Sequence, residues 1–242
     1  MKVGIIGFGR LGKLCASHMV KDFDLYIYDK VDKKEEIKKI KAKPTQIKEF
    51  GICDIVIPFV PISEFENTVL ELKKYLKPGT LVIDVCSVKE HPVKVMKEHF
   101  SEEIQILATH PMFGPDSAKD TLFGTKVAIH PERINIDLYN SIKSYLQRNG
   151  VKTIETTPEK HDKEIANTLV LTHVIGRTLV DMNVEDHEID TKGYRRLLKI
   201  LQTVENDSWQ LFDDMNSYNQ YAEPIRESFK KSLNNILKRL EH

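Results

Sequence analysis

A histidine in the middle of this 242-residue chain has a setting in which it could act as a base. His110 stands in the segment THPMFGP, residues 109–115, directly after the apolar run 104–108. Ser87 follows another apolar run, residues 81–84. Because ligands of open α/β sheets bind at the carboxyl ends of the strands, we expect both side chains to face one crevice. An imidazole in such a crevice can accept a proton from a substrate.

The first twelve residues indicate what that crevice binds. After the apolar run 1–6, the pattern G-x-G-x-x-G is filled by Gly7, Phe8, Gly9, Arg10, Leu11 and Gly12. In the dinucleotide fingerprint, such glycines permit a tight turn, a close approach of the pyrophosphate and close packing of the following helix. The phosphates would then bind to the amides at the N-terminus of that helix. A base beside a hydride acceptor predicts a dehydrogenase.

Asp29 bears on the identity of the dinucleotide. It ends the apolar run 25–28 and follows the fingerprint by about 20 residues, where an acid is expected to accept hydrogen bonds from the adenosine ribose. A carboxylate there repels a 2′-phosphate, which favours NAD over NADP. Lys30, Lys33 and Lys34 stand close by in the sequence and could offset a phosphate charge, so NADP stays open as a cofactor.

The first 157 residues alternate between strand and helix patterns. This alternation predicts an α/β domain with a Rossmann-like, doubly wound and mostly parallel sheet that binds the dinucleotide. Besides the runs named above, we expect strands at residues 54–57, 126–130 and 153–155, and helices at 10–20, 64–75 and 137–148. Val60 and Pro61 would lie at the cofactor edge, and Ser63 would be the N-cap of the second helix.

From residue 158 to residue 242 the pattern changes. Apolar residues recur at helical spacing and few strand signals remain, so we expect an all-α domain. Its apolar faces are numerous for its length, which indicates that part of its surface is buried against another subunit. We therefore expect the helical domain to mediate dimerisation and to bind substrate.

Composition argues against several other classes of protein. Lys plus Arg and Asp plus Glu number 36 each, so no net charge would recruit nucleic acid or an anionic membrane. No apolar run approaches the ~20 residues of a membrane span, and the first strand starts at Met1, so we expect a cytoplasmic protein without a signal peptide. The three cysteines lack metal-ligand spacing, and no metal site is predicted.

Several motifs together resemble the prephenate and arogenate dehydrogenases of tyrosine biosynthesis, especially the plant-type arogenate enzymes. In chain order they are residues 7–12, 84–89, 109–119, 161–162, 172–177, 191–194 and 206–209. The resemblance implies NAD(P)-dependent oxidative decarboxylation of a cyclohexadienol, either prephenate to 4-hydroxyphenylpyruvate or arogenate to tyrosine, by a homodimer. It implies that His110 accepts the hydroxyl proton, and that Ser87 hydrogen-bonds this histidine and the nicotinamide region.

The resemblance also implies substrate contacts in the helical domain. His173 matches a histidine that contacts the substrate carboxylates, whereas His161 is expected to be a cap or an interface residue. Bacterial members of the family place an arginine for the ring carboxylate where this chain has Leu198. Its role could pass to one of four basic residues, among which the sequence does not decide: Lys192, Arg195, Arg196 and Lys199.

Asp207 bears on the choice of substrate. Arogenate carries an α-ammonium where prephenate carries a keto group, so an acid in the pocket would attract arogenate. The plant-type arogenate enzymes have an acid in the matching segment, and we expect arogenate to be preferred or both substrates to be accepted. The alternative for Asp207 is a helix N-cap, which its Asn-Asp-Ser setting also suits.

Two other functions fit part of the pattern. A β-hydroxyacid dehydrogenase shares the architecture but uses a lysine base, and the segment 109–115 argues against it. A non-catalytic dinucleotide sensor would retain the glycine fingerprint alone. The presence of both Ser87 and His110 argues against such a sensor.

Overall fold

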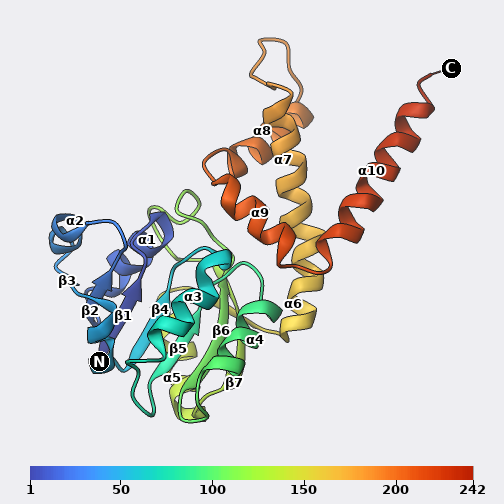
Figure 1. The fold of residues 1–242 in the computed structure, drawn as a ribbon. Helices are drawn as coiled ribbons and strands as arrows, with labels where there is room; N and C mark the ends of the chain where they lie inside the picture. The colour runs from blue at the N-terminus through green and yellow to red at the C-terminus, as the bar shows by residue number, and fades with distance from the viewer. Residues whose placement is uncertain (242) are drawn as a thin grey trace. The chain divides into compact units, whose positions relative to one another are not determined.

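The computed structural model describes residues 1–241, and the chain forms two compact units, Met1–Glu159 and Lys160–His242. The first unit is α/β and the second is helical (Figure 1). The first unit ends at residue 159, two residues after the boundary at residue 157 that the sequence predicts.

An eight-stranded sheet forms the centre of the first unit, in the order β3-β2-β1-β4-β5-β6-β7-β8. The strands are β1 (Lys2–Ile6), β2 (Asp24–Tyr28), β3 (Lys43–Pro44), β4 (Ile55–Pro58), β5 (Leu81–Asp84), β6 (Gln105–Pro111), β7 (Lys126–Arg133) and β8 (Lys152–Glu155). All neighbouring strands pair in parallel except β6 and β7, which are antiparallel. The expected Rossmann-like, mostly parallel sheet is confirmed.

Helices connect and cover these strands. They are α1 (Arg10–Met19), α2 (Lys34–Lys39), the 3-10 helix η1 (Ile47–Ile52), α3 (Ile62–Leu72), α4 (Glu90–His99) and α5 (Ile136–Arg148). Figure 1 shows α3 and α4 in front of the sheet. Right-handed crossovers place α1, which leads to β2, on the face opposite to α3 and α4. The carboxyl ends of β1, β4, β5 and β6 therefore meet at one edge of a sheet that is covered on both faces.

Two local expectations need correction. Ser63 is not the N-cap of α3, because the helix begins at Ile62 and its N-cap is Pro61, whose φ of −54° already suits a helix start. The strand that carries His110 does not end at residue 108. It continues to Pro111 because the antiparallel partner β7 extends the ladder, and His110 pairs with Ala128.

The second unit consists of helices that pack on one another. A long helical stretch comprises α6 (Pro158–Ile165), the π-helical turn η2 (Ala166–Val170) and α7 (Leu171–Asp181), and it is followed by α8 (Lys192–Glu205), α9 (Trp209–Ser217) and α10 (Ala222–Lys238). Gly176 brings α7 close to α8, since a Cβ there would lie 2.6 Å from Cγ2 of Val204. The predicted all-helical fold of this unit is confirmed.

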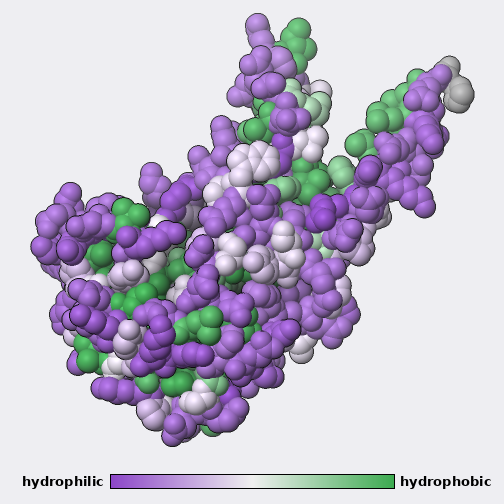
Figure 2. Space-filling view, in the orientation of Figure 1, coloured by the Kyte–Doolittle hydropathy of each residue, from purple (hydrophilic) through white to green (hydrophobic). Residues whose placement is uncertain are grey.

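Hydrophilic side chains dominate the face of the molecule shown in Figure 2. Within residues 1–241 we find no helix whose length and apolar character would suit a membrane span. Apolar side chains do gather along the outer part of α10 in the same view.

Candidate active site

The glycine loop between β1 and α1 has the geometry of a phosphate cradle. Gly7 has a φ of +93°, and a Cβ there would lie 2.2 Å from the carbonyl oxygen of Phe59. A Cβ on Gly12 would lie 2.2 Å from the carbonyl oxygen of Gly7, so both positions require glycine. A Cβ on Gly9 would meet nothing within 4 Å, and Gly9 caps α1 without any side-chain bond. The amides at the start of α1 therefore face open space that fits a pyrophosphate.

Asp29, at the end of β2, is tied to the same loop. Its carboxylate accepts hydrogen bonds from the backbone N–H of Phe8 at 2.7 Å and of Val31 at 2.8 Å. Burial raises the pKa of Asp29, but these two amides and the nearby Lys33 together lower the pKa below its usual range. Asp29 is thus a carboxylate at the edge of the glycine loop, where a ribose is expected.

The other residues predicted to bind the cofactor lie in different settings. The side chain of Phe8 is buried in the core, so this residue contributes its backbone to the loop. Arg10, the first residue of α1, forms an ion pair at 2.6 Å with Asp116 from the segment after β6, and both side chains are about half exposed. Val60 and Pro61 directly follow β4, at the same edge of the sheet as the glycine loop.

Ser87 lies just beyond the end of β5, and His110 lies near the end of the neighbouring parallel strand β6. Asp84 of β5 is opposite Ala108 of β6, which places Ser87 three residues and His110 two residues further along. His110 is 6% exposed, and the hydroxyl of Ser87 is buried without a hydrogen-bond partner among the described residues, so the expected hydrogen bond between Ser87 and His110 is not formed. A buried hydroxyl without a partner is unfavourable unless a bound group satisfies it. Ser87 therefore fits a site that is completed by a ligand.

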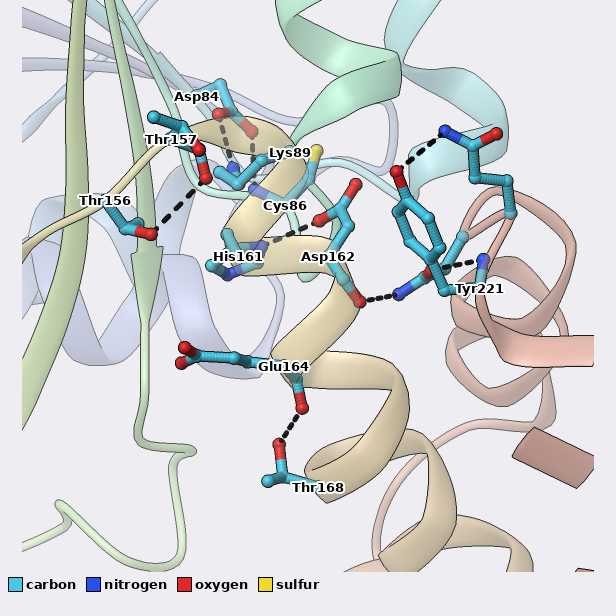
Figure 3. A network of polar contacts seen from close by, with 12 residues as sticks. Asp84, Cys86, Lys89, Thr156, Thr157, His161, Asp162, Glu164, Thr168 and Tyr221 are labelled. Carbon is cyan, nitrogen blue, oxygen red and sulfur yellow. Dashed lines mark hydrogen bonds and ion pairs between the residues drawn. The ribbon is translucent and has the colours of Figure 1, made fainter. Parts of the chain in front are cut away.

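A buried ion pair fixes both strand ends. Lys89 Nζ donates to the Asp84 carboxylate and to the carbonyl oxygen of Thr109, and the side chains of Lys89 and Asp84 are at most 2% exposed. Asp84 also accepts a hydrogen bond from the backbone N–H of Cys86 at 2.8 Å (Figure 3). The hydroxyl of Thr109 donates to the carbonyl oxygen of Asp84 at 2.6 Å. These bonds brace the loop that carries Ser87 against the strand that carries His110.

A second polar cluster lies within the helical unit, on α7 and the turn before α9. His173 Nε2 lies 3.6 Å from a carboxylate oxygen of Asp207, and Arg177, one turn further along α7, donates to the backbone carbonyl of Asp207. Ser208, not Asp207, is the N-cap of α9, because its hydroxyl accepts a bond from the N–H of Leu211.

The other residues of the helical unit that were expected to bind substrate show no contact with that cluster. Arg195 forms a two-pronged ion pair with Asp190 on the surface, at 2.7 to 3.0 Å. Lys192 is exposed at the start of α8, and Leu198 is buried, so an apolar side chain fills the position of the bacterial arginine. The structure thus brings together His173 and Asp207 but shows no contact of Lys192 or Arg195 with them.

His161 does not cap a helix, which corrects one of its two expected roles. It lies within α6 and is 4% exposed, and its Nδ1 is 2.7 Å from a carboxylate oxygen of Asp162. The backbone carbonyl of Asp162 accepts a bond from the side chain of Asn219, whose own oxygen accepts from the N–H of Tyr221 (Figure 3). These contacts join α6 to the turn before α10.

The environment of His173 predicts how stability depends on pH. Burial and the charge of Arg177 lower the pKa of His173 from 6.5 to about 4, although a carboxylate oxygen of Asp207 lies 3.6 Å from its Nε2. As pH falls from 6.5 towards 4, the unfolded chain gains a proton here that the folded chain does not. The free energy of unfolding should therefore decrease with a slope of up to about 1.4 kcal/mol per pH unit.

Thermal melts of the wild type and of His173→Gln between pH 7 and pH 4.5 test this expectation. The variant should lose less stability than the wild type as pH falls, whereas His187→Gln, at an exposed loop position, should follow the wild type. Parallel curves for the wild type and His173→Gln would contradict the assigned environment.

Comparison with known proteins adds a family to this geometry. The model of the nucleotide-binding domain of prephenate dehydrogenase matches residues 16–155, more than half of the chain. The chain belongs to the prephenate dehydrogenase family. Its first unit is the nucleotide-binding domain of that family, and residues 178–242 match a second model, the TYRAAT1-like C-terminal domain.

Two plant proteins are among the relatives of this chain. The chain is 31% identical over 95% of its length to arogenate dehydrogenase 1, chloroplastic, of Arabidopsis thaliana, and 29% identical over 99% to arogenate dehydrogenase 2, chloroplastic. It spans 37% of the length of the first relative and 70% of the second. The solved prephenate dehydrogenase of A. aeolicus with hydroxyphenyl propionate and NAD+ has the same fold, with a TM-score of 0.78, 22% identity, and coverage of 100% of this chain and 92% of that chain.

Two residues of the clusters were missed as site residues by the sequence reasoning. Lys89 and Arg177 both stand inside motifs that carry the family resemblance, but no role followed from their type alone. Lys89 is five residues beyond Asp84 across the Ser87 loop, a spacing that allows an acid and a base to meet. Arg177 is four residues beyond His173, which places both on one helix face. Only the structure shows that both cations are buried.

Proposed function

We propose that this protein is an NAD(P)-dependent dehydrogenase that oxidatively decarboxylates a cyclohexadienol, either prephenate or arogenate. The observation that carries the proposal is the placement of His110 and Ser87. Ser87 follows the end of β5 and His110 lies near the end of the adjacent strand β6, and the buried Asp84–Lys89 pair braces both strand ends, at the sheet edge that also bears the glycine loop. A base beside a dinucleotide cradle suits the removal of a hydroxyl proton during hydride transfer.

The residues of the first unit fit a nicotinamide dinucleotide. The pyrophosphate would bind at the start of α1, the adenosine ribose at Asp29, and the nicotinamide near Ser87, whose hydroxyl has no partner among the described residues. When bound, the oxidised cofactor accepts the hydride from the hydroxyl-bearing ring carbon. NAD is the preferred form in this proposal. Lys33, 3.5 Å from Asp29, donates to the carbonyl oxygen of Phe8 and is thus engaged away from a 2′-phosphate.

The reaction requires the protein chiefly to position the substrate and to transfer a proton. His110 accepts the hydroxyl proton of the substrate as the ring carbon is oxidised, and the hydroxyl of Ser87, which has no partner among the described residues, is left to bind the nicotinamide region. Once carbon dioxide has left, the electron pair of the broken bond completes an aromatic ring. His110 then returns the proton to the phenolic oxygen. Aromatisation drives the reaction, so the rate depends on how well the side chains hold the ring in place.

Asp207 supports a preference for arogenate. Its carboxylate lies 3.6 Å from Nε2 of His173, a residue that the family resemblance assigns to the substrate. A carboxylate in that place would attract the α-ammonium of arogenate, whereas prephenate has an uncharged keto group there and gains no such attraction.

Steady-state turnover with each pairing of NAD+ or NADP+ with prephenate or arogenate tests the proposed function. We expect reduced nicotinamide to form fastest with NAD+ and arogenate. A strong preference for prephenate would refute the role of Asp207 but leave the reaction class standing. If no pairing produced reduced nicotinamide, the proposed function itself would be wrong.

We also propose a homodimer that forms through α10. Four apolar side chains that are 45% to 77% exposed recur at helical spacing along its outer half and the turn that follows it, where Figure 2 shows apolar side chains: Leu233, Ile236, Leu237 and Leu240. Such a stripe on an otherwise polar helix is typical of a protein interface. A second copy of the same helix would cover it symmetrically.

Replacing Leu237 by glutamate should dissociate this dimer. Each copy loses the burial of one leucine, about 2 kcal/mol, and a two-fold interface loses it twice. Light scattering should give a dimer for the wild type and a monomer for Leu237→Glu. Asn235→Glu introduces the same charge off the apolar stripe and should stay dimeric. A monomeric wild type would contradict the proposal.

A further inference from the structure

Arg177 carries a buried charge that has no counterion. It is 7% exposed, and its guanidinium donates to the backbone carbonyl of Asp207 and lies over the ring of Trp209, 4.4 Å from the centroid. Its Nε has no hydrogen-bond partner, and it forms no ion pair with any of residues 1–241. A guanidinium cannot lose its proton in a protein, and buried charges are normally paired. The position therefore lacks an anion.

The neighbours of Arg177 do not supply this anion. They do indicate the chemistry of a ligand that would supply it. His173 is 2% exposed, its Nδ1 has no partner among the described residues, and its lowered pKa keeps it neutral at pH 7. A carboxylate oxygen of Asp207 lies 3.6 Å from His173 Nε2, and the Asp207 side chain is 27% exposed. One small cluster thus presents a positive group, a negative group and a neutral hydrogen-bonding group.

We infer that Arg177 binds the α-carboxylate of the substrate side chain, while Asp207 faces the α-ammonium on the same carbon. This inference rests on the proposed function. An α-amino acid group carries a negative and a positive group on one carbon, and the cluster offers a group of opposite charge for each, Arg177 and Asp207. The fork of Nε and a terminal nitrogen matches a carboxylate in two hydrogen bonds. The side-chain carboxylate is thus bound by a residue of α7, and not by Lys192 or Arg195, the exposed cations of α8.

A purely structural role for Arg177 makes a different prediction. If it only held the carbonyl of Asp207 and packed against Trp209, its loss would disturb the cluster for every ligand alike. If it binds the carboxylate, its loss matters only for ligands that carry one. Ligands that share a phenol ring but differ in their side-chain charges separate these two roles.

Three such probes are L-tyrosine, tyramine, which lacks the carboxylate, and 3-(4-hydroxyphenyl)propionate, which lacks the ammonium. Their affinities for the full chain with saturating NAD+ can be measured by calorimetry in the wild type, Arg177→Gln and Asp207→Asn. Arg177→Gln should weaken L-tyrosine and the propionate about 10- to 100-fold, and change tyramine by less than about threefold. Asp207→Asn should weaken L-tyrosine and tyramine and spare the propionate. Arg148→Gln, an exposed matched control on α5, should change none of them.

Thermal melts check that the variants fold. Where Arg177→Gln is unstable, Arg177→Lys keeps the charge but loses the fork, and it should show a smaller loss confined to the two carboxylate probes. Equal losses for all three probes, no loss for the carboxylate probes, or no binding of any probe by the wild type would overturn the inference. Wild-type turnover separates the two claims, because an active enzyme whose Arg177 variants fail to discriminate the probes refutes only the role of Arg177.

Discussion

Replacing His110 by asparagine should lower kcat by about 10²- to 10⁴-fold, the usual contribution of a positioned general base. The variant retains a polar side chain at the end of β6 but has no group that can take the hydroxyl proton. NAD+ should bind as tightly as to the wild type, because the glycine loop and Asp29 are unchanged. Stopped assays for kcat and calorimetry for NAD+ affinity measure both effects.

A matched control for this experiment is His99→Asn. His99 ends α4 and pairs with Glu66 on the surface, at 3.1 Å, so its loss should leave kcat unchanged. A His110→Asn protein that binds NAD+ and turns over at the normal rate would refute the catalytic assignment. Loss of NAD+ binding would instead show that His110 has a structural role in the cofactor site.

Lys89→Met should be among the most destabilising single changes in the first unit. It removes one partner of a fully buried ion pair and leaves the charge of Asp84 unpaired, at a cost of about 3 to 5 kcal/mol. It also frees the carbonyl of Thr109, next to His110, so kcat should fall as well. Calorimetric melts and steady-state kinetics measure both effects.

A second substitution makes this prediction specific. In Asp84→Asn/Lys89→Met, no unpaired buried charge remains, so the double variant should recover part of the stability lost by Lys89→Met. Lys97→Met breaks a pair with Glu132 whose lysine is more than half exposed, and it should cost less than about 1 kcal/mol. A melt of Lys89→Met that coincides with that of Lys97→Met would show that the buried pair does not brace the site.

Sequence patterns that span only a few residues predicted the fold and the cofactor loop. The turn at Gly7, the start of α1 and the place of Asp29 after β2 all depend on residues within one β-α-β unit, where spacing decides geometry. The end of β6 was placed too early, because its continuation through His110 depends on pairing with β7, which comes about twenty residues later.

The clusters around the site depended on contacts that no local pattern contains. Ser63 has a typical cap side chain, but Pro61 already fixes the start of α3, and Ser208 rather than Asp207 caps α9. No sequence pattern indicated that Lys89 and Arg177 are buried, and lysine and arginine are seldom buried. Their burial follows from the packing of the β5 loop against β6 and of α7 against α8, which the sequence does not reveal.

The stoichiometry of the reaction tests the central claim most directly. Reduced nicotinamide and carbon dioxide can be measured together while the purified protein turns over arogenate or prephenate with NAD+. An oxidative decarboxylase should release the two products in equal amounts from the first turnover onward. Reduced nicotinamide without carbon dioxide would reveal a simple alcohol dehydrogenase, and no reduced nicotinamide with either substrate would contradict the account.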